Sequence, residues 1–267
     1  MLLLAAAFVS AGFLEFPPGV EIGPLSAVAV DREDRIYVLH RGPLPLLAFD
    51  KHGKYLHGWG AGLFKVAHGL RIGPAGAVWT TDNGNHEVRG FTPAGKPLAT
   101  LTARFKAPDD IVFARDGSMF VADTGNARIL KLSSGGAVLS QWGRKGTAEG
   151  EFATAHGLAI DSRDRIYVAD RGNNRVQVFD SNGNFLAAWT GFGNPFGLLI
   201  VGGELLVSDG DAHRITHLSL DDGRITAQWG DPQSLQLPHL MAVDSRGRLY
   251  IAEVNGKRVQ IFERAPR

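Results

Sequence analysis

One unit of alternating strands and polar turns recurs along the chain and constrains its fold more than any other feature. The clearest copy runs from His156 to Asp180. In its first part, apolar residues alternate with small or polar ones on both sides of the polar turn Asp161–Arg165, which is the period of a β-strand. A third strand-like run follows, and Phe185–Trp189 is a fourth. The unit therefore predicts a four-stranded antiparallel meander of about forty residues.

The same unit occurs six times in matching register. Its copies open on Ser26–Asp31, His68–Gly73, Asp109–Ala114, His156–Asp161, Phe196–Val201 and His239–Asp244. A sheet this small cannot bury its apolar faces alone, so six of them would pack radially and close a ring. The sequence thus predicts an all-β fold, a six-bladed β-propeller of four-stranded antiparallel blades.

The two ends of the chain indicate how this ring closes. The sixth unit stops after its third strand, Val259–Phe262, so the apolar segment 1–16 would supply the missing strand to a single propeller domain over residues 17–267. The same segment is similar to the apolar and cleavage parts of a secretory signal, although no Lys or Arg precedes it, and it is too short to span a bilayer. We expect an exported protein, periplasmic or extracellular, or otherwise a cytoplasmic one, with no integral membrane segment.

Composition excludes several classes of function. The net charge is +1 and no basic run with interleaved aromatic residues occurs, so we expect no nucleic-acid partner. Cysteine is absent, which excludes a disulfide framework and thiolate chemistry. Six blades of about forty residues account for nearly all of the 267 residues, so we expect one domain. We also expect a monomer.

Three histidines occupy the equivalent position of the second, fourth and sixth units: His68, His156 and His239. Alternate blades of a six-bladed ring lie about 120° apart, and this position opens the innermost strand, which lines the central channel. The three imidazoles would therefore converge near the axis. Three imidazoles with an open position form a catalytic zinc site, although imidazole also suits copper, nickel and iron. The sequence predicts a metal centre with zinc as the preferred ion.

The alternative is that histidine simply caps a turn at the opening of a blade, with no metal. The other three units carry Ser26, Asp109 and Phe196 at this position. A general capping role would not select every second blade, so the pattern favours the metal.

Two further side chains are candidates for chemistry. Arg41 follows the second strand of the first unit, where its guanidinium would hold a substrate carboxylate at two points or, alternatively, pair with a neighbouring blade. Arg171 has the same position in the fourth unit. His86 lies in a loop that would face the channel mouth, four residues after Asp82. The acidic residue at the end of most second strands repeats so regularly that we expect it to tie strands and turns together.

The repeats resemble NHL repeats, as at Val121–Ile129 and Val168–Val176. Within that group the chain resembles the catalytic domain of the peptidyl-α-hydroxyglycine α-amidating lyases, six-bladed propellers with a three-histidine zinc site. The likeness falls on Leu39–Gly42, Ala67–Leu70 and Pro238–His239, together with the opening of the fourth unit. It implies His68, His156 and His239 as zinc ligands and Arg41 as the substrate-binding arginine.

The chain departs from this family at two places. The loop Asp123–Asn126 lacks the family's catalytic tyrosine, and the tyrosines present read as strand residues. Metal-activated water or His86 would then have to serve as the base. Leu240 stands where the family has the Asp associated with a structural calcium ion, so calcium is implied by the resemblance without its expected ligand.

The resemblance implies a zinc-dependent lyase that cleaves a C–N bond in a small-molecule or peptide substrate bearing a carboxylate. The same site would also suit a metal-dependent lactonase or esterase that uses metal-activated water. The other class is a non-catalytic NHL platform that binds a ligand or protein with its loops. Three histidines facing the channel favour an enzyme, because a binding platform does not need them.

Overall fold

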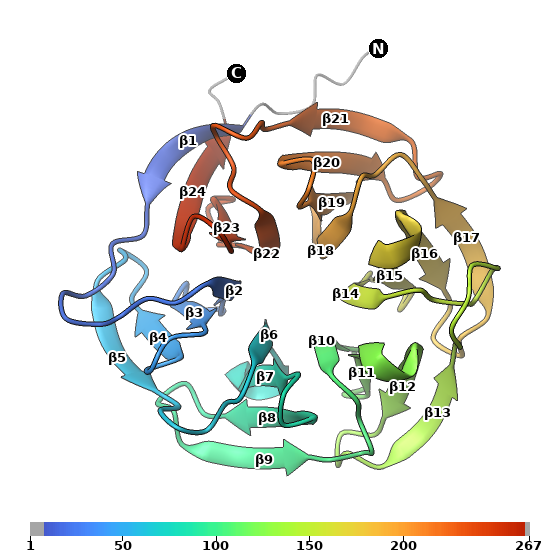
Figure 1. Cartoon of the computed structure of the whole chain (residues 1–267), viewed down its shortest axis with the longest axis horizontal. Coiled ribbons are helices and arrows are strands. Elements are labelled where there is room, and N and C mark those ends of the chain that lie inside the picture. Colours follow the sequence, from blue (N-terminus) through green and yellow to red (C-terminus); the bar gives the residue numbers. More distant parts are fainter. Residues whose placement is uncertain (1–7, 265–267) are drawn as a thin grey trace.

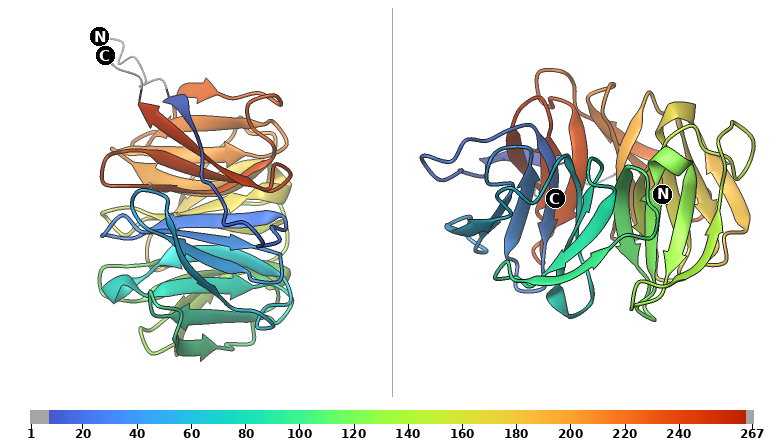
Figure 2. Two further views of the ribbon diagram at one scale, coloured as in Figure 1. Left: turned by 90° about the vertical axis from the view of Figure 1, so that its left-hand side faces the viewer. Right: turned by 60° about the horizontal axis from the view of Figure 1, so that its bottom comes forward.

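The alternating apolar residues of each repeat form strands that pair into six separate four-stranded antiparallel sheets. The computed structural model describes residues 8–264. The sheets stand radially about one axis, each with its first strand innermost (Figure 1). Figure 2 shows the same ring from the side, as a thick disc whose edge is formed by the outer strands. The all-β, six-bladed β-propeller predicted from the repeats is confirmed.

Blades one to five each contain four consecutive strands. Blade one has β2 (Leu25–Val30), β3 (Ile36–His40), β4 (Leu46–Phe49) and β5 (Tyr55–Trp59), and blade two has β6 (Ala67–Ile72), β7 (Val78–Asp82), β8 (Glu87–Phe91) and β9 (Pro97–Leu101). Blade three has β10 (Pro108–Phe113), β11 (Met119–Asp123), β12 (Arg128–Leu132) and β13 (Val138–Trp142). Blade four has β14 (Ala155–Ile160), β15 (Ile166–Asp170), β16 (Arg175–Phe179) and β17 (Phe185–Trp189), and blade five has β18 (Pro195–Val201), β19 (Glu204–Asp209), β20 (Arg214–Ser219) and β21 (Ile225–Trp229). Three short 3₁₀ helices lie in the turns, at Pro74–Gly76, Thr124–Asn126 and Arg171–Asn173.

The sixth blade joins the two ends of the chain. It consists of β22 (Pro238–Val243), β23 (Leu249–Glu253), β24 (Arg258–Arg264) and, as its outer strand, β1 (Phe8–Phe13). β1 pairs antiparallel with β24 and lies outside it, at the rim of the ring (Figure 1). The predicted closure by an N-terminal strand is confirmed for this part of the segment 1–16, whereas residues 1–7 lie outside the described residues. Within residues 8–264, no helix has the length and apolar character needed to cross a membrane.

The core lies between neighbouring blades and is built on their second strands, whose side chains are buried on both faces. Tyr37, Tyr167 and Tyr250 are fully buried there. Each hydroxyl donates to a carboxylate of the preceding turn, as Tyr37 does to Asp31 at 2.8 Å. Burial raises the pKa of Tyr250 to about 12. These tyrosines are strand residues with a structural role, as the sequence predicted.

The repeated acidic residue at the end of the second strand ties each of blades two to six to the segment that enters it. In blade four, Asp170 accepts hydrogen bonds from the backbone N–H groups of Ala153 and Thr154 at 3.0 and 3.2 Å and from Arg175 at 2.9 Å. Similar backbone contacts recur in other blades, at Asp82, Asp123, Asp209 and Glu253. The structural role expected from the repetition is confirmed.

Candidate metal centre

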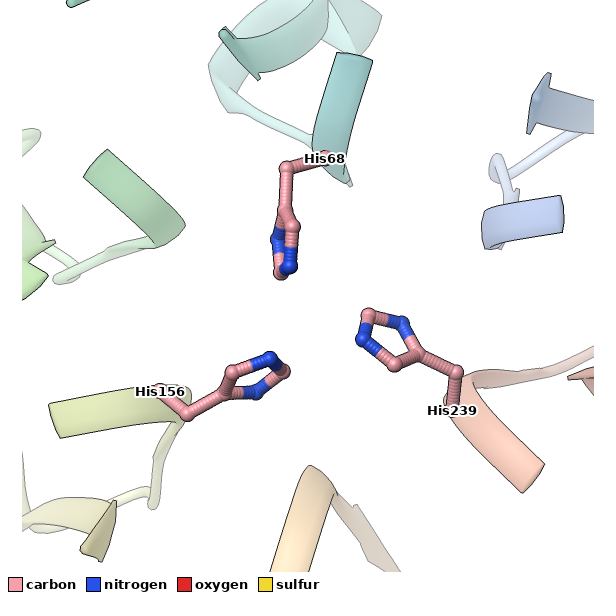
Figure 3. A group of neighbouring side chains, drawn as sticks. All are labelled: His68, His156 and His239. Atoms are coloured by element: carbon pink, nitrogen blue, oxygen red, sulfur yellow. The ribbon is translucent and has the colours of Figure 1, made fainter. Parts of the chain in front are cut away.

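The structure brings His68, His156 and His239 together on the axis of the ring. They project from the starts of β6, β14 and β22, and their rings point toward one another (Figure 3). The three ring centroids lie 4.9–5.0 Å apart. In each of the three blades the pairing of the inner strand shifts register across the histidine, and such a bulge redirects a side chain. One potential ligand atom of each histidine lies within 4.8 Å of the others, and all three residues are buried.

Backbone carbonyls of the neighbouring blades fix the tautomer of all three rings. Nδ1 of His68 lies 2.9 Å from the carbonyl oxygen of Asp109, and Nδ1 of His156 lies 2.9 Å from that of Phe196. Nδ1 of His239 approaches the carbonyl oxygen of Ser26 at 2.5 Å. A carbonyl oxygen only accepts, so each Nδ1 carries a proton, and in the neutral ring Nε2 keeps its lone pair. Metal-binding histidines are held in this way in proteins.

The pKa values of two of the histidines favour the binding of a cation. Burial lowers the pKa of His156 to about 4 and lowers the pKa of His239 well below its usual value. At neutral pH these two imidazoles are therefore uncharged and free to bind. Three oriented imidazole nitrogen donors fit zinc or another imidazole-binding divalent metal.

The blades between the histidines place three different side chains around the same point. The Phe196 ring packs against His156 and His239, with centroid distances of 5.2 and 5.3 Å. The Asp109 carboxylate lies beside the other pair, with Oδ1 3.7 Å from Nε2 of His68 and Oδ2 3.9 Å from Nε2 of His156. In the sequence, Asp109 was recognised only as an interruption of the histidine pattern. Asp109 has the same repeat position as the histidines, and this shared position predicts that it lies at the centre.

Arg41 lies at the rim of this centre. Its Nε donates to the carbonyl oxygen of Ala67, the residue before His68, at 3.2 Å. Burial lowers the pKa of the Arg41 guanidinium, and the negative charge of Asp109 opposes this shift. No carboxylate in the described part of the chain forms an ion pair with Arg41. The contact with the neighbouring blade therefore leaves its charge available to a ligand.

Arg171 approaches the centre from blade four, which faces blade one across the axis (Figure 1). Its Nε donates to Asn194 Oδ1 at 2.9 Å, and its guanidinium lies 4.1 Å from the centroid of the Phe196 ring. The positive charge of Arg171 contributes to the lowered pKa of His156. Two arginines from opposite blades thus border the histidines.

His86 is not among the side chains gathered at the axis. It is an exposed residue of the turn between β7 and β8 and has a left-handed backbone, with φ of 59°. His213 has the same place in blade five, in the turn before β20, with φ of 52°. His86 Nδ1 accepts the backbone N–H of Ala107 at 3.0 Å, so in the neutral ring the proton is on Nε2. This geometry favours a turn-stabilising role over that of a base.

The residues present do not fit the calcium site that the family resemblance implies. Leu240 is buried with Leu39 and Leu70 in an apolar cluster and supplies no side-chain oxygen where the family has a carboxylate. The positively charged side chain of Arg71 lies along the same inner strands. Arg71 forms a two-point ion pair with Asp110 at 3.0 and 2.6 Å and also donates to the carbonyl oxygen of Leu158 at 2.9 Å.

Comparison with known families agrees with this architecture. The NHL repeat family matches residues 64–91 and 152–179, the segments that contain His68 and His156. Residues 121–129, where the sequence also resembles the repeat, are outside these matches. The chain is a six-bladed β-propeller with NHL-repeat matches in two of its blades and a buried three-histidine cluster on its axis.

The curated relatives that match this chain include amidating lyases. Peptidyl-alpha-hydroxyglycine alpha-amidating lyase 1 of Drosophila melanogaster is 31% identical over 162 residues, which cover 47% of this chain and 30% of that protein. A probable peptidyl-alpha-hydroxyglycine alpha-amidating lyase of Caenorhabditis elegans is 29% identical over 182 residues, covering 54% of this chain and 52% of that protein. The chain is homologous to these lyases, and the matches span 30% of the fly protein and about half of the nematode one.

A solved structure shares the fold over nearly the whole length. It is described as a streptogramin B lyase structure, and it superposes with a TM-score of 0.73, covering 96% of this chain and 97% of the other. The sequence identity is 12%, so this likeness concerns the fold alone.

Proposed function

We propose that this chain is a zinc-dependent, lyase-like enzyme that cleaves a C–N bond in a small substrate bearing a carboxylate. The observation that carries the proposal is the convergence of three buried histidines whose Nδ1 atoms are each engaged by a backbone carbonyl, which leaves Nε2 as the atom for a metal. A binding platform has no use for such a donor set. The homology to amidating lyases supports the type of reaction.

Each residue at the centre has a definite task in this proposal. His68, His156 and His239 would hold the metal, which when bound supplies a Lewis acid that polarises a substrate hydroxyl oxygen. Arg41, with no carboxylate partner of its own, would bind the substrate carboxylate. Arg171 adds positive potential from the opposite side and draws an anionic end toward the axis.

The reaction proposed is the cleavage of an α-hydroxyglycine end. The hydroxyl oxygen loses its proton and becomes the carbonyl of glyoxylate while the C–N bond breaks, and the nitrogen takes up a proton to become an amide. The tyrosines in β3, β15 and β23 cannot serve as the base because they are buried and hydrogen-bonded within the core. The fourth, Tyr55, lies in the outer strand β5 and packs against Phe49. The proton acceptor thus differs from the tyrosine that the family resemblance implies.

The test begins with metal content and product. Protein purified without a His tag is expected to hold about one zinc ion per chain by elemental analysis. It is expected to release glyoxylate from a peptidyl-α-hydroxyglycine, to lose this activity on chelation and to recover it with zinc. Hydrolysis of a lactone or ester without glyoxylate release would assign the esterase alternative. Absence of stoichiometric metal after zinc is supplied and the excess removed would leave the binding platform as the function.

The Arg41→Ala substitution is expected to lower kcat/KM for a substrate with a free carboxylate by roughly 10- to 100-fold, because it removes a charge-assisted contact. Metal content is expected to stay at the wild-type level, because Arg41 supplies no ligand atom. Arg224→Ala is the matched control, since Arg224 is an exposed surface arginine. Equal activity of Arg41→Ala and wild type on acidic substrates would remove Arg41 from substrate recognition.

A further inference from the structure

We propose that Asp109 is the fourth protein ligand of the central metal, which makes the centre a three-histidine, one-carboxylate site, and that Asn83 is the residue that positions it. The inference rests on the proposed metal-dependent function and specifies the donor set of the same site. Neither the histidine pattern nor the family resemblance includes a carboxylate in the metal site.

The distances place the Asp109 carboxylate at ligand spacing. In a tetrahedral zinc site with metal–ligand bonds of 2.0–2.1 Å, neighbouring donor atoms lie about 3.3 Å apart. Oδ1 of Asp109 is 3.7 Å from Nε2 of His68, and Oδ2 is 3.9 Å from Nε2 of His156. The group of ligand atoms that all lie within 4.8 Å of one another contains the three histidines alone, and Asp109 lies beside it on the side of His68 and His156. A shift of the carboxylate toward an ion would add an oxygen donor, and because zinc can expand to five ligands, a position for substrate would remain.

The composition of this group suits a cation. The backbone carbonyls hold the Nδ1 protons of His68 and His156, so a metal would bind at their Nε2 atoms, which are the atoms that the Asp109 carboxylate approaches. Asp109 is only 4% exposed, and a buried carboxylate is stabilised by a positive partner. A divalent ion among these atoms would supply that charge.

The surroundings of Asp109 hold its carboxylate toward the histidines. Asn83 Nδ2 donates to Oδ1 at 2.7 Å. The backbone carbonyl of Asp109 accepts both His68 Nδ1–H and the Thr81 hydroxyl, each at 2.9 Å. The residue is thus fixed at its backbone and at one carboxylate oxygen. The equivalent positions Ser26 and Phe196 carry no carboxylate, so Asp109 is the one acidic donor that this ring of positions supplies.

The experiment measures metal affinity, not turnover. Zinc and cobalt dissociation constants are determined by chelator competition for the wild type, Asp109→Asn and Asn83→Leu. Asp109→Asn is expected to weaken both metals at least about 10-fold and to change the visible absorption of the cobalt form, because an anionic oxygen donor is lost. Asn83→Leu is expected to give a smaller loss in the same direction. Asp211→Asn is the matched control, because Asp211 is an exposed carboxylate that also accepts an asparagine amide, from Asn194.

The outcomes separate this inference from the proposed function. Wild-type affinity and an unchanged cobalt spectrum in Asp109→Asn would overturn the carboxylate ligand and leave a three-histidine centre. If Asp109→Asn lowers the stability of the metal-free protein without weakening metal binding, Asp109 is an ion-pair partner of His68 and not a ligand. Failure of the wild type to bind either metal would overturn the metal function and this inference together. Circular dichroism of each variant shows whether it is folded.

Discussion

Arg71→Met is expected to lower the free energy of unfolding by about 3–5 kcal/mol, because it leaves a buried carboxylate without its cation. The Arg71 side chain is 14% exposed and that of Asp110 is 1% exposed, and their two contacts are 3.0 and 2.6 Å long. Asp110 also accepts the backbone N–H of Leu158 at 2.9 Å. The pair therefore joins blades two, three and four around the axis, and its loss weakens several blade contacts together. Urea and thermal unfolding measure the effect.

A paired substitution and a surface control make this expectation specific. The double variant Arg71→Met, Asp110→Leu removes both charges and is expected to recover much of the loss, since well-packed apolar side chains often replace a buried ion pair at little cost. Arg224→Met disrupts the exposed pair with Asp222, whose side chains are 71% and 60% exposed, and is expected to change stability by about 0–1 kcal/mol. An Arg71→Met protein as stable as Arg224→Met would show that the axial pair does not hold the blades together.

The inner strands also predict how the protein responds to calcium. The family resemblance implies a structural calcium ion, but Leu240 offers it no side-chain oxygen, and the guanidinium of Arg71 lies along the inner strands. Because this positive charge belongs to a side chain, a chelator cannot remove it. The thermal midpoint of the metal-free protein is therefore expected to be insensitive to added calcium.

The architecture followed from the sequence because it depends on local patterns that repeat. The strand alternation, the turn residues and the acidic residue at the end of the second strand are each readable within one unit. Six units in register then leave a closed ring as the way to bury their apolar faces. The missing strand of the last unit also indicated that the N-terminal segment closes the ring, as β1 does.

The composition of the centre was only partly predictable, because its contacts join blades that are far apart in the sequence. The histidines were recognisable since they share one repeat position. Asp109 shares it too, but a carboxylate becomes informative only once its distances to His68 and His156 are known. The turn role of His86 depends on a left-handed backbone conformation at a non-glycine residue, which the residue type did not reveal. The cross-axis contacts of Arg71 likewise have no signature within a single blade.

His156→Ala is expected to abolish stoichiometric metal binding and reduce lyase activity to background. A structural zinc site contributes apparent binding free energies of about 10–16 kcal/mol over its full ligand set, so losing one ligand is expected to weaken affinity on the order of 10²–10³-fold. His68→Ala and His239→Ala are expected to behave alike, because the three rings are related by the ring's symmetry and each has its own carbonyl partner. Elemental analysis after gel filtration measures the metal, and glyoxylate release measures the activity.

The melting temperature is a second, independent measure of zinc binding at this site. A ligand at 1,000 times its dissociation constant stabilises the folded state by about 4.1 kcal/mol, so zinc is expected to raise the melting temperature of the wild type and not that of the three alanine variants. His52→Ala is the matched control, because His52 is an exposed turn residue that supplies no ligand, and it is expected to keep both the metal and the shift. If His156→Ala retains one zinc ion per chain and the full thermal shift, the metal binds elsewhere, and the axial histidines are then a packing arrangement held by the carbonyl groups of neighbouring blades.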